Sequence, residues 1–152
     1  MSRKGNQPVE RREGGAVTLD KSLNPRQDAP SAMPNVVLDA NALMMPFQFG
    51  LNLSAEIERL LGRCEIFVPS SVRSELMKLS SKDRTAKAAL KLCGRFAEVA
   101  TRSVGDDGVV EAALTLDAVV VTNDSDLLQA LKEKRIRRIR LRSRSHLVID
   151  GE

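Results

Sequence analysis

The chain has 152 residues, of which 42% are hydrophobic and 29% charged, a size and balance that suit one globular domain with an attached segment. No stretch approaches the roughly 18 consecutive apolar residues of a membrane span, and the charged N-terminal segment lacks the apolar centre of a secretory signal, so we expect a soluble cytoplasmic protein without a membrane partner. Cys64 and Cys93 lie far apart without a CxxC neighbour, which excludes a disulfide framework and a zinc ribbon. Any bound metal must therefore have oxygen ligands.

Residues 1–33 mix Gly, Pro, Asn, Gln and Ser with charged residues and show neither the apolar period of a helix nor that of a strand. This composition predicts a disordered basic and polar tail, because it offers too little apolar surface to offset the entropy lost on folding. We therefore expect the folded domain to span residues 34–152.

From residue 34 onward, short apolar runs alternate with amphipathic stretches. The apolar runs predict strands at 36–38, 66–68, 118–121 and 139–141. Apolar residues at helical spacing predict helices at 53–61, 70–79, 86–97, 109–114 and 127–131, the second of them capped by Ser70 or Ser71. Strands joined by helices of this length imply right-handed crossovers, so the sequence predicts a three-layer α/β fold with helices on both faces of a parallel sheet.

The net charge is +4, but its distribution is uneven, since the segment 132–144 carries eight basic residues and a single acid. Such a segment suits a polyanionic partner such as RNA, because phosphate contacts release bound counterions. Arginines that alternate with Ile139 and Leu141 are also typical of an edge strand that points charge at water to prevent pairing with another sheet. The two interpretations are compatible. The candidate RNA contacts are Arg138, Arg140, Arg142 and Arg144.

Acidic residues lie where an α/β sheet binds its ligands, outside the carboxyl ends of the strands. Asp39 ends the first predicted strand, and Glu75 lies one turn into the helix after the second. Two adjacent acids open the helix before the third strand and two more follow that strand, namely Asp106, Asp107, Asp124 and Asp126. Most of them also have a structural explanation, since an aspartate can cap a helix and Glu75 can pair with Lys78.

Taken together, these acids indicate a metal site. Carboxylates that converge on one edge of a sheet repel one another and raise each other's pKa unless a cation neutralises them. Asp39 adds to this cost, because a carboxylate directly after a buried strand needs partners to offset its lost hydration. Mg²⁺ or Mn²⁺ is the natural cation, since both prefer carboxylate and water oxygens.

Four segments, in this order along the chain, resemble the four acidic motifs of the PIN-domain nucleases: LDANALMMPFQ, PSSVRSEL, GDDGVVEAA and VTNDSDL. The resemblance runs from about residue 35 to the C-terminus. The first segment, continued by FG, resembles the archaeal branch akin to the eukaryotic rRNA-processing nucleases of the small-subunit processome. It is less similar to the typical toxin of a VapBC pair.

The resemblance implies a fold and a role for each matching residue. The fold is an α/β/α sandwich around a parallel sheet with strand order 3-2-1-4-5. The implied catalytic acids and metal ligands are Asp39, Glu75, Asp107 and Asp124, with Asp126 as an outer or second-metal ligand. Asp107 is preferred to Asp106 because the family places its aspartate one residue before the hydrophobic face of the helix. The implied polar supports of this cluster are Asn41 and Thr122.

The implied activity is that of a Mg²⁺- or Mn²⁺-dependent endoribonuclease, which hydrolyses RNA phosphodiester bonds in rRNA processing and ribosome biogenesis. Its partner would be an rRNA precursor, and the resemblance also implies a homodimer. His146, beside the basic segment, is expected to contact solvent or phosphate rather than to act as a general base, since a metal ion activates water without it.

Three alternatives remain open. A toxin ribonuclease of a VapBC pair would share the chemistry and add an antitoxin partner. A non-cleaving module would bind RNA or an assembling ribosome through the same fold. A phosphatase of the haloacid dehalogenase type also has an aspartate after its first strand, but it needs a second aspartate two residues later, where this chain has Asn41.

Overall fold

A six-stranded sheet organises residues 33–151, which are the residues that the computed structural model describes. The predicted tail, residues 1–33, lies outside the described residues except for Met33. The strands are β1 (Asn35–Leu38), β2 (Glu65–Pro69), β3 (Ala97–Val99), β4 (Val119–Val121), β5 (Arg138–Arg142) and β6 (His146–Asp150). The helices are α2 (Ala40–Phe49), α3 (Leu53–Leu61), α4 (Ser70–Ser80), α5 (Arg84–Cys93), α6 (Gly105–Leu116) and α7 (Ser125–Glu133).

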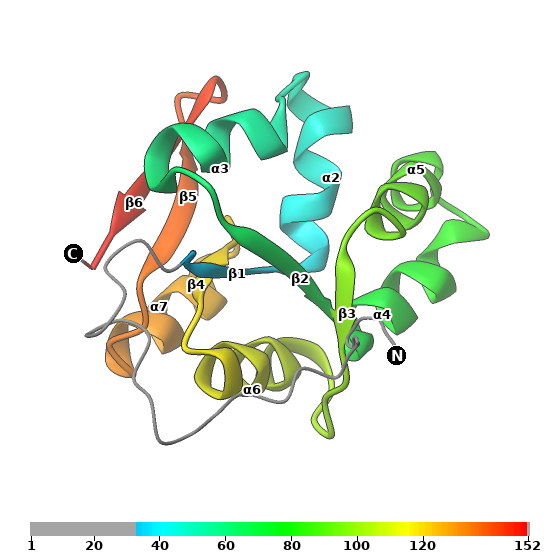
Figure 1. The fold of residues 1–152 in the computed structure, drawn as a ribbon. Coiled ribbons are helices and arrows are strands. Elements are labelled where there is room, and N and C mark those ends of the chain that lie inside the picture. Colours follow the sequence, from blue (N-terminus) through cyan, green and yellow to red (C-terminus); the bar gives the residue numbers. More distant parts are fainter. Residues whose placement is uncertain (1–32, 152) are drawn as a thin grey trace. The chain divides into compact units, whose positions relative to one another are not determined.

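The strands lie in the order β3-β2-β1-β4-β5-β6. The first five are parallel and confirm the predicted order 3-2-1-4-5, whereas β6 pairs with β5 in the antiparallel direction. Helices α2 and α3 lie on one side of the sheet, and α6 and α7 lie on the other (Figure 1). The predicted three-layer α/β fold is therefore confirmed, with one strand more than expected.

The two central strands form the core. All of β4 and the last three residues of β1 are buried, because neighbouring strands and helices cover both of their faces. In the register of this pair, Leu38 lies opposite Val121, so the residues that follow them, Asp39 and Thr122, leave the sheet side by side.

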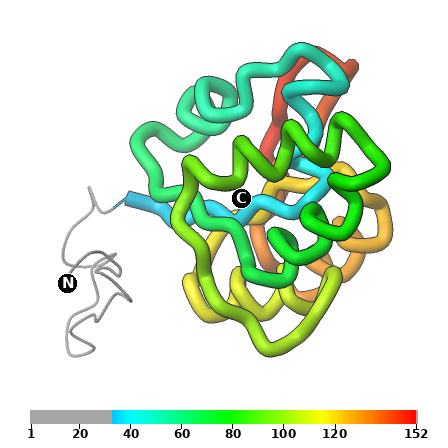
Figure 2. The backbone as a smooth tube through the Cα atoms, turned by 90° about the vertical axis from the view of Figure 1, so that its right-hand side faces the viewer, coloured from blue at the N-terminus to red at the C-terminus, as the bar shows by residue number. Residues whose placement is uncertain are grey.

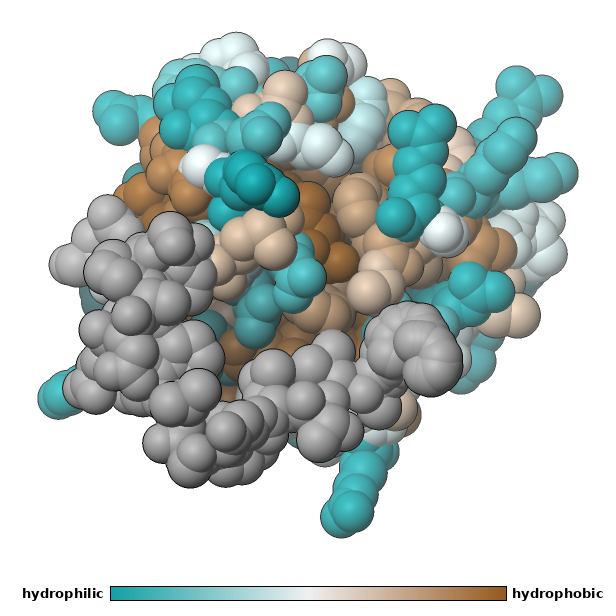
Figure 3. Space-filling view, viewed as in Figure 1, coloured by the Kyte–Doolittle hydropathy of each residue, from teal (hydrophilic) through white to brown (hydrophobic). Residues whose placement is uncertain are grey.

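Helices and charged side chains enclose this core. At one end of the sheet α4 and α5 pack on each other (Figure 2). Hydrophilic side chains project around the hydrophobic residues visible at the centre of one face (Figure 3). Within residues 33–151, no helix has the length and apolar character needed to cross a membrane.

Helix α2 is not predicted by the sequence pattern. Its residues ANALMMPFQF are mostly apolar and include Pro46, and Ala40, Ala42, Leu43 and Met45 are buried. A helix that is buried over much of its surface has no continuous polar face, so the period of 3.6 residues is weak. The helix is delimited by its caps instead, since Asp39 caps its start and Gly50, with a φ of 67°, ends it.

Two predicted boundaries around α4 and α5 are wrong. Helix α5 ends at Cys93 rather than at residue 97, and residues 97–99 form the edge strand β3. Phe96 continues the apolar stripe only because it packs on the core from the turn after Gly94. Helix α4 is not capped by Ser70 or Ser71, since its N-cap residue is Pro69, which forms no side-chain cap.

The prediction of an edge strand at 139–141 is also wrong. Strand β6 forms the edge, so β5 is paired on both sides, with Ile139 and Leu141 buried. The turn that joins the two strands passes through Ser143 and Arg144, both in the left-handed region with φ of 55° and 58°. Such turns usually carry glycine or asparagine, and this one therefore gives no hairpin signal in the sequence.

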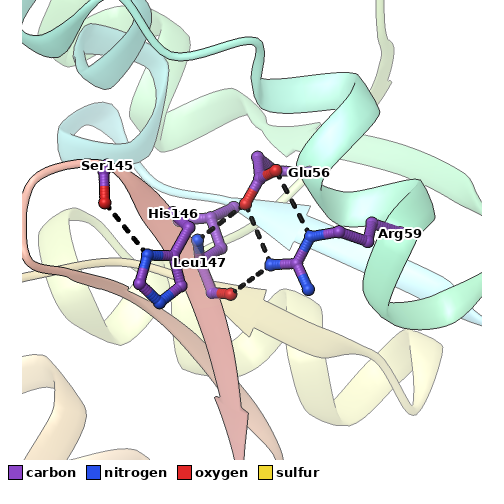
Figure 4. A network of polar contacts seen from close by, with 5 residues as sticks. All are labelled: Glu56, Arg59, Ser145, His146 and Leu147. Atoms are coloured by element: carbon purple, nitrogen blue, oxygen red, sulfur yellow. Dashed lines mark hydrogen bonds and ion pairs between the residues drawn. The ribbon is translucent and has the colours of Figure 1, made fainter.

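The outer edge of β6 is covered by helix α3 (Figure 4). The Glu56 carboxylate accepts a hydrogen bond from the Leu147 N–H at 2.9 Å, and the Arg59 guanidinium donates to the Leu147 carbonyl at 2.7 Å. Arg59 also pairs with Glu56 at 3.0 Å. These two side chains occupy the N–H and the carbonyl of Leu147, two of the backbone groups that a seventh strand would use, which helps to protect the edge from pairing with another sheet.

Replacing Glu56 with alanine should destabilise the domain by roughly 1 kcal/mol, because the Leu147 N–H loses its acceptor. We expect a fall of a few °C in the melting temperature, measured by thermal unfolding, and self-association through β6, measured by size-exclusion chromatography. Glu58→Ala, an exposed acid on the same helix, is the control and should change neither quantity. Equal behaviour of the two variants would contradict this role of Glu56.

An acidic rim as the candidate active site

Asp39 is the buried centre of the acidic rim, with 6% of its surface exposed at the carboxyl end of β1. Its Oδ1 accepts a hydrogen bond from the Ala42 N–H at 2.7 Å, which caps α2, and its Oδ2 accepts one from the Thr122 hydroxyl. The pKa of Asp39 is raised to about 7, mainly by burial and also by the charges of Asp106 and Asp124, while the two hydrogen bonds oppose the rise. The partners expected for a carboxylate in this position are therefore present.

Thr122 joins the ends of the two central strands. It is fully buried, and its hydroxyl both donates to Asp39 and accepts from the Asp124 N–H at 3.1 Å. Asp124 in turn caps α7, since its Oδ1 accepts from the Leu127 N–H at 2.9 Å. The capping explanation thus holds for both strand-end acids, and capping fixes the orientation of each carboxylate at the rim.

Asn41 and Asn123 hold the loop that follows β4. The Asn41 Oδ1 accepts a hydrogen bond from the Asn123 N–H at 2.8 Å, and the Asn123 Oδ1 accepts one from the Leu141 N–H at 3.3 Å. This chain of amides ties the start of α2 to the loop and to β5. The role of Asn41 as a polar support of the acids stays a prediction, and Asn123, which is not among the predicted supports, belongs to the same chain of hydrogen bonds.

Asp106 is the acid of α6 that is coupled to the others. Partial burial raises its pKa, and so do the charges of Asp124, Asp126 and Asp107. Its own charge raises the pKa of both Asp39 and Glu75, each of which is shifted mainly by burial. Among the groups with shifted pKa values, Asp107 acts only on Asp106.

The periodicity of α6 does not separate Asp106 from Asp107. Asp106 lies three, four and seven residues before the buried Val109, Val110 and Ala113, whereas Asp107 lies three residues before Val110 and seven before the exposed Leu114. The assignment of Asp107 as a metal ligand stays a prediction, and Asp106 is the alternative ligand on α6.

The donor chemistry at the rim fits a hard divalent cation, since every candidate ligand is a carboxylate. The charges of Asp106 and Asp124 raise the pKa of Asp39, and the charge of Asp124 also raises the pKa of Asp106, an environment that such a cation would relieve. Within residues 33–151, however, no three His, Cys, Asp or Glu side chains come together closely enough to form a metal site. The ligand set therefore stays a prediction, and so does the position of Asp126 in it.

The four candidate arginines do not form one continuous patch of free charge. The Arg138 guanidinium donates to the Ile136 carbonyl at 3.0 Å, and Arg140 pairs with Asp150 at 2.7 Å. Arg142 is exposed at the C-terminal end of β5, and Arg144 is exposed in the turn that follows it.

His146 begins β6, the edge strand at the opposite end of the sheet from β3. Its Nδ1 is 3.0 Å from the Ser145 hydroxyl, in the polar network beside α3 (Figure 4). The expectation that His146 is not a general base for the acidic rim stays a prediction.

Comparison with known proteins gives consistent matches. A family model described as a PIN like domain matches residues 36–144. Ribonuclease VapC9 of Archaeoglobus fulgidus is 32% identical over 105 residues, which cover 66% of this chain and 77% of the relative. Ribonuclease VapC4 of Methanocaldococcus jannaschii is 30% identical over 129 residues, which cover 78% and 98%. The solved structure of the PIN domain endonuclease Utp24 has the same fold, with a TM-score of 0.65 at 19% identity over 78% of this chain and 92% of that chain.

Asp39→Asn should stabilise the metal-free protein above neutral pH. The native pKa of Asp39, about 7, exceeds its ordinary value of 3.8, so the folded state binds more protons between these pH values and stability falls as the pH rises through this window. The variant has no carboxyl group to ionise at this position, so it does not lose this stability. Its side-chain oxygen can still accept the hydrogen bond from the Ala42 N–H. We expect its melting temperature with chelator to exceed that of the wild type by several °C at pH 8, with the difference shrinking toward pH 4.

The matched control for this experiment is Asp83→Asn, which alters the exposed cap of α5. This variant should gain no stability at pH 8, because its carboxylate is hydrated. An Asp39→Asn variant that is less stable than the wild type at pH 8 would contradict the cost assigned to the buried charge.

Proposed function

Because the chain belongs to the PIN-like domain family, we propose that it is a metal-dependent endoribonuclease that hydrolyses RNA phosphodiester bonds. The observation that carries the proposal is the arrangement of four acids: Asp39 follows β1, Glu75 lies on α4, Asp106 begins α6 and Asp124 follows β4, and the charges of Asp106 and Asp124 raise the pKa values of their neighbours. Two relatives that are named ribonucleases support RNA as the substrate class.

The residues that would hold Mg²⁺ or Mn²⁺ are Asp39, Glu75, Asp106 and Asp124, with Asp126 beside them and Asp107 as the alternative to Asp106. When bound, such an ion lowers the pKa of a water molecule and neutralises charge on the phosphate. The chain's own residues orient the carboxylates: the Thr122 hydroxyl holds Asp39 and the backbone of Asp124. Since the pKa of Asp39 is about 7, its affinity for a cation should increase as the pH rises through that value and level off above it.

For contacts with the RNA backbone we propose Arg142 and Arg144, which are exposed. Arg138 and Arg140 contribute less, because each already holds a partner within the domain. Such contacts would set affinity and its salt dependence rather than a sequence preference.

Within this activity we propose a role in rRNA processing, on the resemblance of the first acidic motif. A toxin role in a VapBC pair is supported equally, by the two relatives that carry the name VapC. Association with pre-ribosomal particles would favour rRNA processing, and a neighbouring antitoxin reading frame would favour the toxin. RNA binding without cleavage would indicate the non-cleaving module, and the expected homodimer is tested by the mass of the protein in solution.

Asp39→Asn and Glu75→Gln should each abolish RNA cleavage. Either change removes a carboxylate from the cation site, and we expect the rate to fall by at least about 100-fold, since the ion supplies several kcal/mol of transition-state stabilisation. The assay is incubation with a structured rRNA fragment and Mn²⁺, with new ends mapped and a chelator as the blank. Glu58→Gln, on the exposed face of α3, is the control and should cleave normally. Unchanged rates in both rim variants would refute the proposal.

Asp106→Asn and Asp107→Asn separate the two candidates on α6. We expect Asp106→Asn to reduce cleavage about 100-fold and Asp107→Asn by less than about tenfold, because only Asp106 is coupled by charge to Asp39 and Glu75. The stabilisation that Mn²⁺ gives in thermal unfolding should follow the same order. The reverse order would assign the ligand to Asp107, as the motif resemblance implies.

A further inference from the structure

A groove of about 540 Å³ lies beside α7, at the end of the sheet that β5 and β6 form. One face of α7 is its first wall, because the side chains that line the groove recur every three or four residues. They are Ser125, Leu128, Gln129 and Lys132. Ser125 directly follows Asp124 in the chain, so one end of the groove adjoins the acidic rim. None of the roles assigned above uses this face of the helix.

Leu128 gives this wall an apolar contact. The side of α7 that packs on the core carries Leu127 and Leu131, which are fully buried. Leu128 is half-buried and lines the groove instead. An apolar side chain among polar ones suits a ligand that has a flat apolar face as well as polar edges. A nucleobase has both, whereas a phosphate group has no apolar face.

Two arginines and one acid form the opposite wall. Arg138 and Arg140 on β5 and Asp150 on β6 line the groove. The arginines share this face because side chains alternate along a strand, with Ile139 and Leu141 buried on the other face. Asp150 lies opposite Arg138 in the register of the two strands, and its Oδ2 is 2.7 Å from the Arg140 Nε. The wall therefore combines two groups of N–H donors with one carboxylate acceptor.

Contacts within the domain hold both arginines in place. Arg138 donates to the Ile136 carbonyl at 3.0 Å, and Arg140 pairs with Asp150 through its Nε. Gly151 lets the Arg138 side chain lie close to the backbone, since a Cβ there would be 2.9 Å from the Arg138 Nη1. A guanidinium carries several N–H donors in a planar fork, so each arginine keeps most of them for a ligand. Because the side chains are already held, binding costs less side-chain entropy.

We propose that this groove binds a guanine base of the RNA substrate beside the acidic rim. Guanine presents two neighbouring acceptors, O6 and N7, which match a guanidinium fork. The Nη groups of Arg140 would donate to these two atoms, the Asp150 carboxylate would accept from the N1–H and the 2-amino group, and Leu128 would pack on the ring. The groove thus gives Arg140 a role in reading a base rather than in contacting the RNA backbone.

Other ligands match the groove less well. Adenine carries an amino group where guanine has O6, so it would present a donor to the guanidinium fork. A phosphate would be repelled by Asp150, which lies against Arg140. The choice of RNA as the source of the base rests on the proposed function, whereas the preference for guanine rests on the chemistry of the groove.

The experiment measures the affinity of the full chain for short oligouridines by fluorescence anisotropy, with a chelator present to prevent cleavage. A single guanosine is placed at each position in turn. For the wild type we expect one position at which guanosine tightens binding about tenfold and adenosine does not, which is the size of one bidentate base contact. A guanosine analogue with a C–H in place of N7 should lose most of this gain.

Arg140→Lys and Asp150→Asn test the two sides of the base. Arg140→Lys keeps the charge but not the fork, so it should keep the affinity for plain oligouridine and lose the guanosine gain. Asp150→Asn should lose part of the gain, whereas its affinity for plain oligouridine should not fall, because a negative charge is removed. The Arg140 and Asp150 side chains are partly exposed, so neither change should prevent folding, which thermal unfolding checks. Arg95→Lys, at an exposed position outside the groove, is the matched control and should keep the gain.

A guanosine gain that survives in Arg140→Lys would overturn the inference. An equal rise in affinity for every RNA in Asp150→Asn would also overturn it, since the groove would then hold the RNA backbone. Cleavage of RNA with Mn²⁺ by a wild type that shows no preference for guanosine would refute the inference and leave the proposed function standing. A preference for guanosine without any cleavage would support the groove and refute the proposed nuclease activity.

Discussion

The buried carboxylate of Asp39 is the constraint on which the candidate site depends. It lies at the end of a strand whose last three residues are fully buried, and its hydrogen-bond partners within residues 33–151 are the Ala42 N–H and the Thr122 hydroxyl. Thr122 is within reach because β1 and β4 are parallel neighbours in register. Burial and like charge raise the pKa of Asp39 to about 7, so its ionised form costs stability. The apolar packing of the two central strands offsets that cost.

The helix starts around this rim serve two purposes. α2 and α7 are capped by Asp39 and Asp124, so the acids that would bind a cation are also structural caps with fixed orientation. α4 and α6 lack side-chain caps and begin at a cavity that Glu75 lines.

Much of the fold was predictable from the sequence because the central strands are continuous apolar runs. The apolar runs of β1 and β4 predicted buried strands, and the helices predicted between them implied parallel pairing. The elements that escaped prediction lacked such patterns. α2 is too apolar to show a polar face, β3 is a three-residue edge strand, and the turn before β6 uses Ser143 and Arg144 where glycine is usual. Asp106 and Asp107 stand side by side in the sequence, and spacing from a hydrophobic run does not separate them.

The sequence by itself determined the fold class and the positions at which acids follow strands or begin helices, and the resemblance of its motifs implied the strand order through β5. These depend on local patterns of apolar and charged residues, which are legible along the chain. Only the tertiary structure decided which acid of α6 is coupled to Asp39, which arginines are already paired, and that two uncapped helices meet at one cavity. Each of these depends on the rotation and approach of elements far apart in the chain. Such relations are set by packing, and no local pattern encodes them.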